Sequence, residues 1–223
     1  MSPKLEPPDR FELSATPQQL FYHVKHDILA TIGPGYLEYT SIPPAAGYQV
    51  VKSLGLDPQV ERKSVRLLYN PEIRTLSITI PTALHNCHVS WAFQELSHAL
   101  VVGFFTQIEL VDLDFSSNTR FDNFPIPWQN IYKEPDCYIK PAGATLLTLV
   151  FEAGFSESYQ RLIADKNLWL RGGAPVVNVV MLLMWSLISG NKVKGFIELW
   201  RSGAPNPRHV DIFPAPAPGP PHK

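Results

Sequence analysis

The segment that most restricts the fold of this chain is an apolar run that ends in a single charge. Residues 144–151 read Ala-Thr-Leu-Leu-Thr-Leu-Val-Phe, and Glu152 follows directly. A short apolar run that follows a turn signal, here Gly143, is typical of a buried strand. Desolvation of the carboxylate at the end of that strand is costly without a partner. The run therefore predicts a buried strand that ends in a charge.

Helical and extended patterns alternate on both sides of this strand. Helices are predicted at 82–103 and at 156–171, and Gly172 and Gly173 end the second of them. Strands are predicted at 107–115, 135–139, 176–183 and 195–200. From residue 84 the predicted order is helix, three strands, helix, two strands. This order predicts an α/β (α+β) fold with a central mixed sheet flanked by helices.

The amino-terminal third predicts an extension of that core. Residues 17–32 place apolar side chains at helical spacing, and residues 64–80 hold two β-prone runs around a turn, which predicts a hairpin. Because no long linker separates these elements from the rest, we expect a single domain over 17–203 with its core at about 84–200. Proline-rich residues at the two ends predict a flexible amino terminus (1–16) and a flexible tail (204–223).

Charge excludes one class of nucleic-acid binder. The chain has 19 basic and 20 acidic residues, which is too balanced for a protein that wraps nucleic acid by bulk charge. The distribution is uneven, however. Up to residue 132 there are 9 basic and 13 acidic residues (net −4), and from 133 onward 10 basic and 7 acidic (net +3). A small, local phosphate site in the carboxy-terminal part remains compatible with these counts.

Cysteine content and hydropathy predict an intracellular protein, either cytoplasmic or nuclear. Only two cysteines are present, and the first ten residues lack the apolar run of a signal peptide. The longest apolar stretch, residues 176–188, is shorter than the roughly 20 residues that a bilayer span needs. We therefore expect no membrane association. The spacing of the histidines matches none of the usual zinc patterns.

Two carboxylates are placed where they suit a divalent cation. Asp136 stands at the start of one predicted strand, and Glu152 stands at the end of the next. Two hard oxygen ligands converge if these strands are neighbours. A second interpretation is that Glu152 reaches solvent or caps the helix that begins near Ser156.

These residues resemble the PD-(D/E)XK restriction-endonuclease-like superfamily. The similarity consists of Pro135-Asp136, fifteen intervening residues and Glu152-Ala153-Gly154 on an apolar strand, and it covers about residues 84–200. The segment 151–159 also resembles uncharacterised fungal members of that superfamily. The resemblance implies a core of helix, three strands, helix and strand. It further implies a Mg²⁺-dependent nuclease in which Asp136 and Glu152 bind the metal.

The chain departs from the superfamily at the lysine. The position two residues after Glu152, where the superfamily has a lysine that positions or activates water, is Gly154. In some bacterial members the lysine has moved onto the following helix, and Lys166 matches that arrangement. A solvent-facing lysine paired with Glu157 is the alternative interpretation of Lys166.

Two further residues are weaker candidates, Glu95 on the same resemblance and Lys140 on its position in the strand alone. Glu95 lies on the preceding helix, where several members place an additional metal ligand, and Lys140 shares a strand face with Asp136, where it would contact a phosphate. A helix-surface glutamate and a sheet-edge lysine explain these two residues as well.

Two functions from different classes follow. The first is a Mg²⁺-dependent nuclease that cleaves phosphodiester bonds in DNA or RNA. The second is a catalytically degenerate module of the same fold that binds nucleic acid or a protein partner, which Gly154 and the low basic charge favour. A fold without any ligand is a third interpretation.

Overall fold

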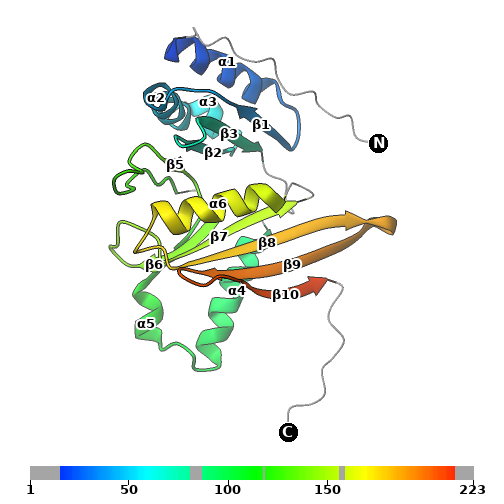
Figure 1. Ribbon diagram of the computed structural model, residues 1–223. Coiled ribbons are helices and arrows are strands. Elements are labelled where there is room, and N and C mark those ends of the chain that lie inside the picture. The colour runs from blue at the N-terminus through cyan, green and yellow to red at the C-terminus, as the bar shows by residue number, and fades with distance from the viewer. Residues whose placement is uncertain (1–15, 81–86, 118, 156–158, 214–223) are drawn as a thin grey trace. The chain divides into compact units, whose positions relative to one another are not determined.

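The computed structural model describes residues 16–80, 87–117, 119–155 and 159–213 (Figure 1). They form two compact units. Unit 1 is drawn from Met1–Thr82 and Thr119–Glu134, and unit 2 from Ala83–Asn118 and Pro135–Lys223. The region for which we expected one domain, 17–203, therefore spans both units. Within the described residues, every helix is too short or too polar to cross a membrane.

Unit 1 packs helices against a four-stranded antiparallel sheet with the order β1-β3-β2-β5. Its helices are α1 (Pro17–Ala30), α2 (Pro44–Gly55) and α3 (Pro58–Glu61), and its strands are β1 (Gly35–Tyr39), β2 (Arg66–Asn70), β3 (Thr75–Ile80) and β5 (Tyr132–Lys133). The helix predicted from residue 17 and the hairpin predicted over 64–80 are confirmed.

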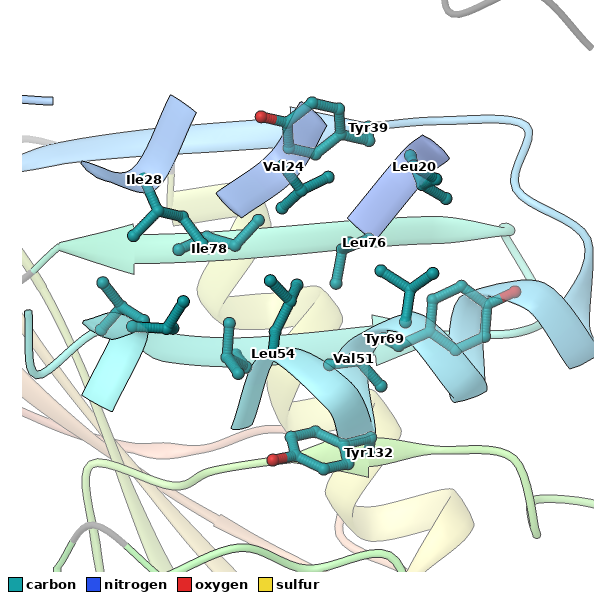
Figure 2. Packing of buried hydrophobic residues seen from close by; sticks show 14 of the residues in the cluster. Leu20, Val24, Ile28, Tyr39, Val51, Leu54, Tyr69, Leu76, Ile78 and Tyr132 are labelled. Atoms are coloured by element: carbon teal, nitrogen blue, oxygen red, sulfur yellow. The ribbon is translucent and has the colours of Figure 1, made fainter. Parts of the chain in front are cut away.

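The core of unit 1 lies between its helices and its sheet. Leu20, Val24 and Ile28 recur every four residues along α1, so they line one face of the helix. Figure 2 shows them beside Leu76 and Ile78 of β3, with side chains of α2 completing the cluster. Helical periodicity in the sequence thus corresponds directly to the buried face.

Asp57 caps α3 and also pairs with α1. Its Oδ1 accepts hydrogen bonds from the backbone N–H groups of Gln59 and Val60 at 2.9 and 3.2 Å, and Lys25 Nζ donates to its Oδ2 at 2.6 Å. The hydrogen bond from Lys25 holds the pKa of Asp57 below its usual range, against the opposing effect of burial. The side chain therefore contributes both a helix cap and an ion pair.

Substitution of Asp57 separates the cap from the ion pair. Asp57→Ala is expected to lower the free energy of unfolding by about 1–2 kcal/mol, whereas Asp57→Asn keeps a capping oxygen and costs about 0.5 kcal/mol. Because the pKa is lower in the folded chain than in the unfolded one, the ion-pair contribution is present above about pH 4 and is lost as the pH falls through the folded pKa. Urea unfolding at pH 7 and at about pH 2 measures both effects. An Asn variant that stays less stable than wild type at low pH would contradict the ion-pair assignment.

Unit 2 contains a six-stranded mixed sheet with the order β10-β9-β8-β7-β6-β4. Its helices are α4 (Cys87–Val101), α5 (Gln107–Val111), α6 (Tyr159–Gly172) and the 3₁₀ turn η1 (Ser189–Asn191), and its strands are β4 (Leu113–Ser116), β6 (Cys137–Pro141), β7 (Leu149–Phe155), β8 (Val179–Ile188), β9 (Lys192–Arg201) and β10 (Arg208–Phe213). Only β7 and β8 pair in parallel, and α6 is the crossover between them. The mixed α and β class predicted from the sequence is confirmed.

Helices cover both faces of this sheet (Figure 1). Phe151 and Ala153 of β7 pack with Ala92 of α4. Glu152, which alternates with them and points to the other face, contacts Trp169 of α6. The face that carries Glu152 is therefore the α6 face of the sheet.

Two segments differ from the expectation. Residues 107–115 form α5 and then the short strand β4, because the Thr106 side chain and Glu109 make a capping box that starts a helix. Arg208–Phe213 lie in the expected tail but form β10, which pairs antiparallel with β9. The proline-rich composition around this segment obscured a short alternation of polar and apolar residues.

Candidate functional site

The two carboxylates singled out in the sequence lie at one end of the β6–β7 pair. Glu152 lies in β7, and Asp136 stands directly before β6, whose first residue Cys137 pairs with Phe151. The backbone N–H of Ala153 in β7 donates to Asp136 Oδ2, which ties the Asp136 side chain to the β7 backbone directly after Glu152. Both acids are therefore attached to the same stretch of β7.

Both carboxylates are buried and hydrogen bonded. Asp136 and Glu152 are each 4% exposed. The backbone N–H of Ala153 donates to Asp136 Oδ2 at 2.7 Å, and Trp169 Nε1 donates to Glu152 Oε1. These donors fix one oxygen of each acid.

Gly154 follows Glu152 on the same face of β7 and leaves little room for a side chain. A Cβ at this position would lie 3.0 Å from Leu162 Cδ1 of α6 and 3.3 Å from Met184 Sδ of β8. A side chain here would require Leu162 to move.

Lys166 of α6 lies on the same face but away from the acids. It is 7% exposed, and its Nζ lies 3.7 Å from the centre of the Trp200 ring, which is a cation–π contact. Trp200 stands on β9, two strands from β7, which corresponds to about 10 Å. Desolvation, followed by the charge of Arg171, lowers the pKa of Lys166, and Glu198 opposes that shift. The Lys166 side chain is therefore held by its contact with Trp200 of β9.

The other candidates are also placed apart from the acid pair. Glu95 is exposed on α4, which covers the opposite face of the sheet. Lys140 Nζ donates to the carbonyl oxygen of Ala144 at 2.7 Å and forms an ion pair with Asp114 at 3.4 Å, so it is engaged at the β4–β6 edge. Glu157, the alternative partner of Lys166, lies outside the described residues.

A third buried acid, Glu198 of β9, was missed in the sequence. Register pairing aligns it with Leu182 of β8, which aligns with Glu152 of β7, so both acids lie in one row on the α6 face. Tyr159 Oη and Trp200 Nε1 donate to Glu198 Oε2 at 2.7 and 3.0 Å. Burial and the hydrogen bond to Glu198 raise the pKa of Tyr159 to about 12.

His209 of β10 completes this cluster. Its Nδ1 lies 3.3 Å from Glu198 Oε1, and its Nε2 lies 3.3 Å from Asp211 Oδ1. Desolvation disfavours the charged ring, but the hydrogen bonds to Glu198 and Asp211 prevail and raise the pKa of His209. The signal for Glu198 in the sequence was a single acid inside the apolar stretch 196–200, as for Glu152 after its apolar run.

The donor set at Asp136 and Glu152 suits Mg²⁺ better than a transition metal. Mg²⁺ is usually held by one or two carboxylates, with waters and substrate phosphates completing its octahedron. In the described part of the chain, no three His, Cys, Asp or Glu side chains are arranged to hold a metal ion.

No protein-family model matches this chain, and no curated protein matches it significantly. Its function is therefore argued from the residues of unit 2.

Proposed function

We propose that unit 2 is a restriction-endonuclease-like, Mg²⁺-dependent nuclease that hydrolyses phosphodiester bonds. The observation that carries this proposal is the hydrogen bond that Asp136 accepts from the Ala153 N–H, which ties its carboxylate to β7 directly after Glu152. Two carboxylates from adjacent segments are a ligand set that one hard cation can share. Because Mg²⁺ coordinates phosphate oxygens, a phosphodiester is the class of substrate that such a site would bind.

The order of elements supports the proposal. Apart from the short helix α5 between α4 and β4, the unit runs from α4 through β4, β6, β7, α6 and β8, which matches the order of helix, three strands, helix and strand that the resemblance implies. Asp136 immediately precedes the second of these strands, and Glu152 lies in the third. At both acids, the position in the fold and the residue type are therefore those that the resemblance implies.

The residues around the acids have distinct tasks. The Ala153 N–H and the Trp169 indole each hold one carboxylate oxygen, which fixes the orientation of both side chains. A bound Mg²⁺ would polarise the phosphate and lower the pKa of a coordinated water.

One observation favours the catalytically degenerate module as a second candidate. The superfamily lysine is replaced by Gly154, and the ammonium group of Lys166 lies over Trp200. In this candidate the acids remain as a buried hydrogen-bonded pair, and the unit binds nucleic acid or a protein without cleaving it. The two candidates differ in whether cleavage accompanies cation binding.

Metal dependence tests the proposal. We expect the full-length chain to cleave end-labelled single- or double-stranded DNA or RNA when Mg²⁺ or Mn²⁺ is added, and EDTA to stop the reaction. Calorimetric titration with Mg²⁺ measures cation binding independently of cleavage. Cation binding without cleavage of any of these substrates would favour the degenerate module. Cleavage that persists in EDTA, or a chain that does not bind Mg²⁺, would contradict the metal site.

A further inference from the structure

A hollow of about 430 Å³ opens on the α6 face of unit 2, beside the start of α6. Its lining residues come from α6, β8 and β9: Tyr159, Met184, Ser186, Lys194, Phe196 and Glu198. The volume falls within the range of small-molecule sites.

The walls of the hollow are aromatic and apolar. Met184 and Phe196 face each other across the β8–β9 pair. The Phe196 ring lies 4.8 Å from the ring of His209 and 6.0 Å from that of Tyr159, measured between centroids. The hydrogen bonds that Glu198 accepts hold Tyr159 and His209 in place. Rigid rings of this kind are the usual stacking surface for a planar group.

The rim of the hollow is polar and carries a cation. Ser186 of β8 is opposite Lys194 of β9 in the register, one step beyond Met184 and Phe196. Lys194 is exposed. An apolar wall for a ring next to an exposed ammonium group matches a ligand that combines a planar ring with an anionic group.

The hollow lies close to the proposed metal site. Met184 is opposite Gly154, which is two residues beyond Glu152 along β7. One strand spacing and two residues correspond to about 8 Å within the sheet. This separation is comparable to that between neighbouring phosphates of an extended nucleic-acid strand.

We propose that the hollow binds one unpaired base of a single-stranded nucleic acid, with Lys194 contacting an adjacent phosphate. The proposal rests on the proposed function for its ligand class and names single strands as the substrate. A base stacked inside a duplex does not reach such a hollow without being flipped out, so single strands are preferred over duplexes. Stacking on aromatic side chains tolerates all four bases, and we expect little sequence preference.

Fluorescence anisotropy of the full-length chain tests this inference. The probes are a labelled oligothymidylate, the same oligonucleotide in a duplex, and a version with abasic sites, all in EDTA so that neither metal nor cleavage is involved. We expect binding of the single strand to be about 5-fold or more tighter than binding of the abasic strand, because base stacking is lost there. We also expect the single strand to bind more tightly than the duplex.

Two variants locate the binding in the hollow. Ser186→Phe fills the space and is expected to weaken binding about 5-fold or more. Lys194→Gln is expected to weaken binding several-fold and to reduce the salt slope by about one. Arg208→Gln is the matched control. Arg208 is exposed and is paired with Leu199, so the two side chains point to the same face of the sheet. This is the face opposite to the α6 face, because Leu199 alternates with Glu198 along β9. The substitution removes the same charge from the opposite face and should leave the affinity unchanged.

The outcomes separate this inference from the proposed function. A dissociation constant weaker than about 100 µM for the single strand would overturn the inference. Tight binding that neither Ser186→Phe nor Lys194→Gln changes would also overturn it, while leaving the metal site untouched. Binding that both variants weaken, in a chain that neither binds Mg²⁺ nor cleaves, would support the hollow and reject the nuclease.

Discussion

Glu152→Gln is expected to abolish Mg²⁺-dependent cleavage and to leave unit 2 folded. Glutamine keeps an oxygen that accepts from the Trp169 indole, so the buried contact survives the change. It removes the negative charge that a hard cation requires. Because a bound metal supplies several kcal/mol of transition-state stabilisation, we expect the cleavage rate to fall by at least about 100-fold. Asp136→Asn is expected to have the same effect, since it keeps the acceptor for Ala153.

Initial rates on a labelled oligonucleotide measure this loss, and thermal unfolding verifies the fold. Glu95→Gln makes the same chemical change on the opposite face of the sheet and is expected to keep the wild-type rate. A wild-type rate in Glu152→Gln would reject the metal site. Loss of activity in Glu95→Gln would instead assign Glu95 as an additional ligand, as the resemblance implies.

The strands of the acid pair were predictable because their signals are local. A proline before Asp136 and a long apolar run before Glu152 mark two strands in sequence, and consecutive strands are usually neighbours. The β6–β7 pair and the hydrogen bond from the Ala153 N–H to Asp136 link the two segments. Locating both acids at this end of the pair thus needed only two strands and the turn between them, and metal binding by the acids stays a prediction.

The position of Lys166 was not predictable in the same way. Helical spacing places Lys166 and Trp169 on one face of α6, but it does not say which strand each side chain reaches. The chain packs Trp169 over β7 and Lys166 over Trp200 of β9. Tertiary packing of a helix across several strands decides such contacts, and no local pattern encodes it.

The α5 segment and β10 show a second limit. Residues 107–115 carry apolar residues at a spacing that fits a strand, yet the capping box at Thr106 starts a helix. A short cap signal thus overrides a weak strand pattern. In β10, pairing with β9 supplies the hydrogen bonds that keep the segment extended. Such pairing joins two separate segments of the chain, so the composition of one segment does not reveal it.

Trp169→Ala is expected to lower the free energy of unfolding by about 3–5 kcal/mol, the largest stability effect that we predict for unit 2. Trp169 is fully buried, so the substitution leaves a large cavity between α6 and the sheet. It also removes the indole donor from a buried carboxylate. The loss of a hydrogen bond to a charged group adds to the cost of the cavity.

Trp169→Phe keeps an aromatic ring and removes the indole N–H together with part of the ring system. A double-mutant cycle of urea unfolding with Glu152→Met, which keeps the length of the side chain and removes the acceptor, separates the hydrogen bond from the lost packing. The cycle is expected to show a coupling energy of about 1 kcal/mol or more. Trp200→Phe is the matched control, since Trp200 donates to Glu198 and stands two strands from β7. Its effect and that of Glu152→Met should add within about 0.5 kcal/mol. Additive effects of Trp169→Phe and Glu152→Met would mean that the indole only fills space and does not hold the acid.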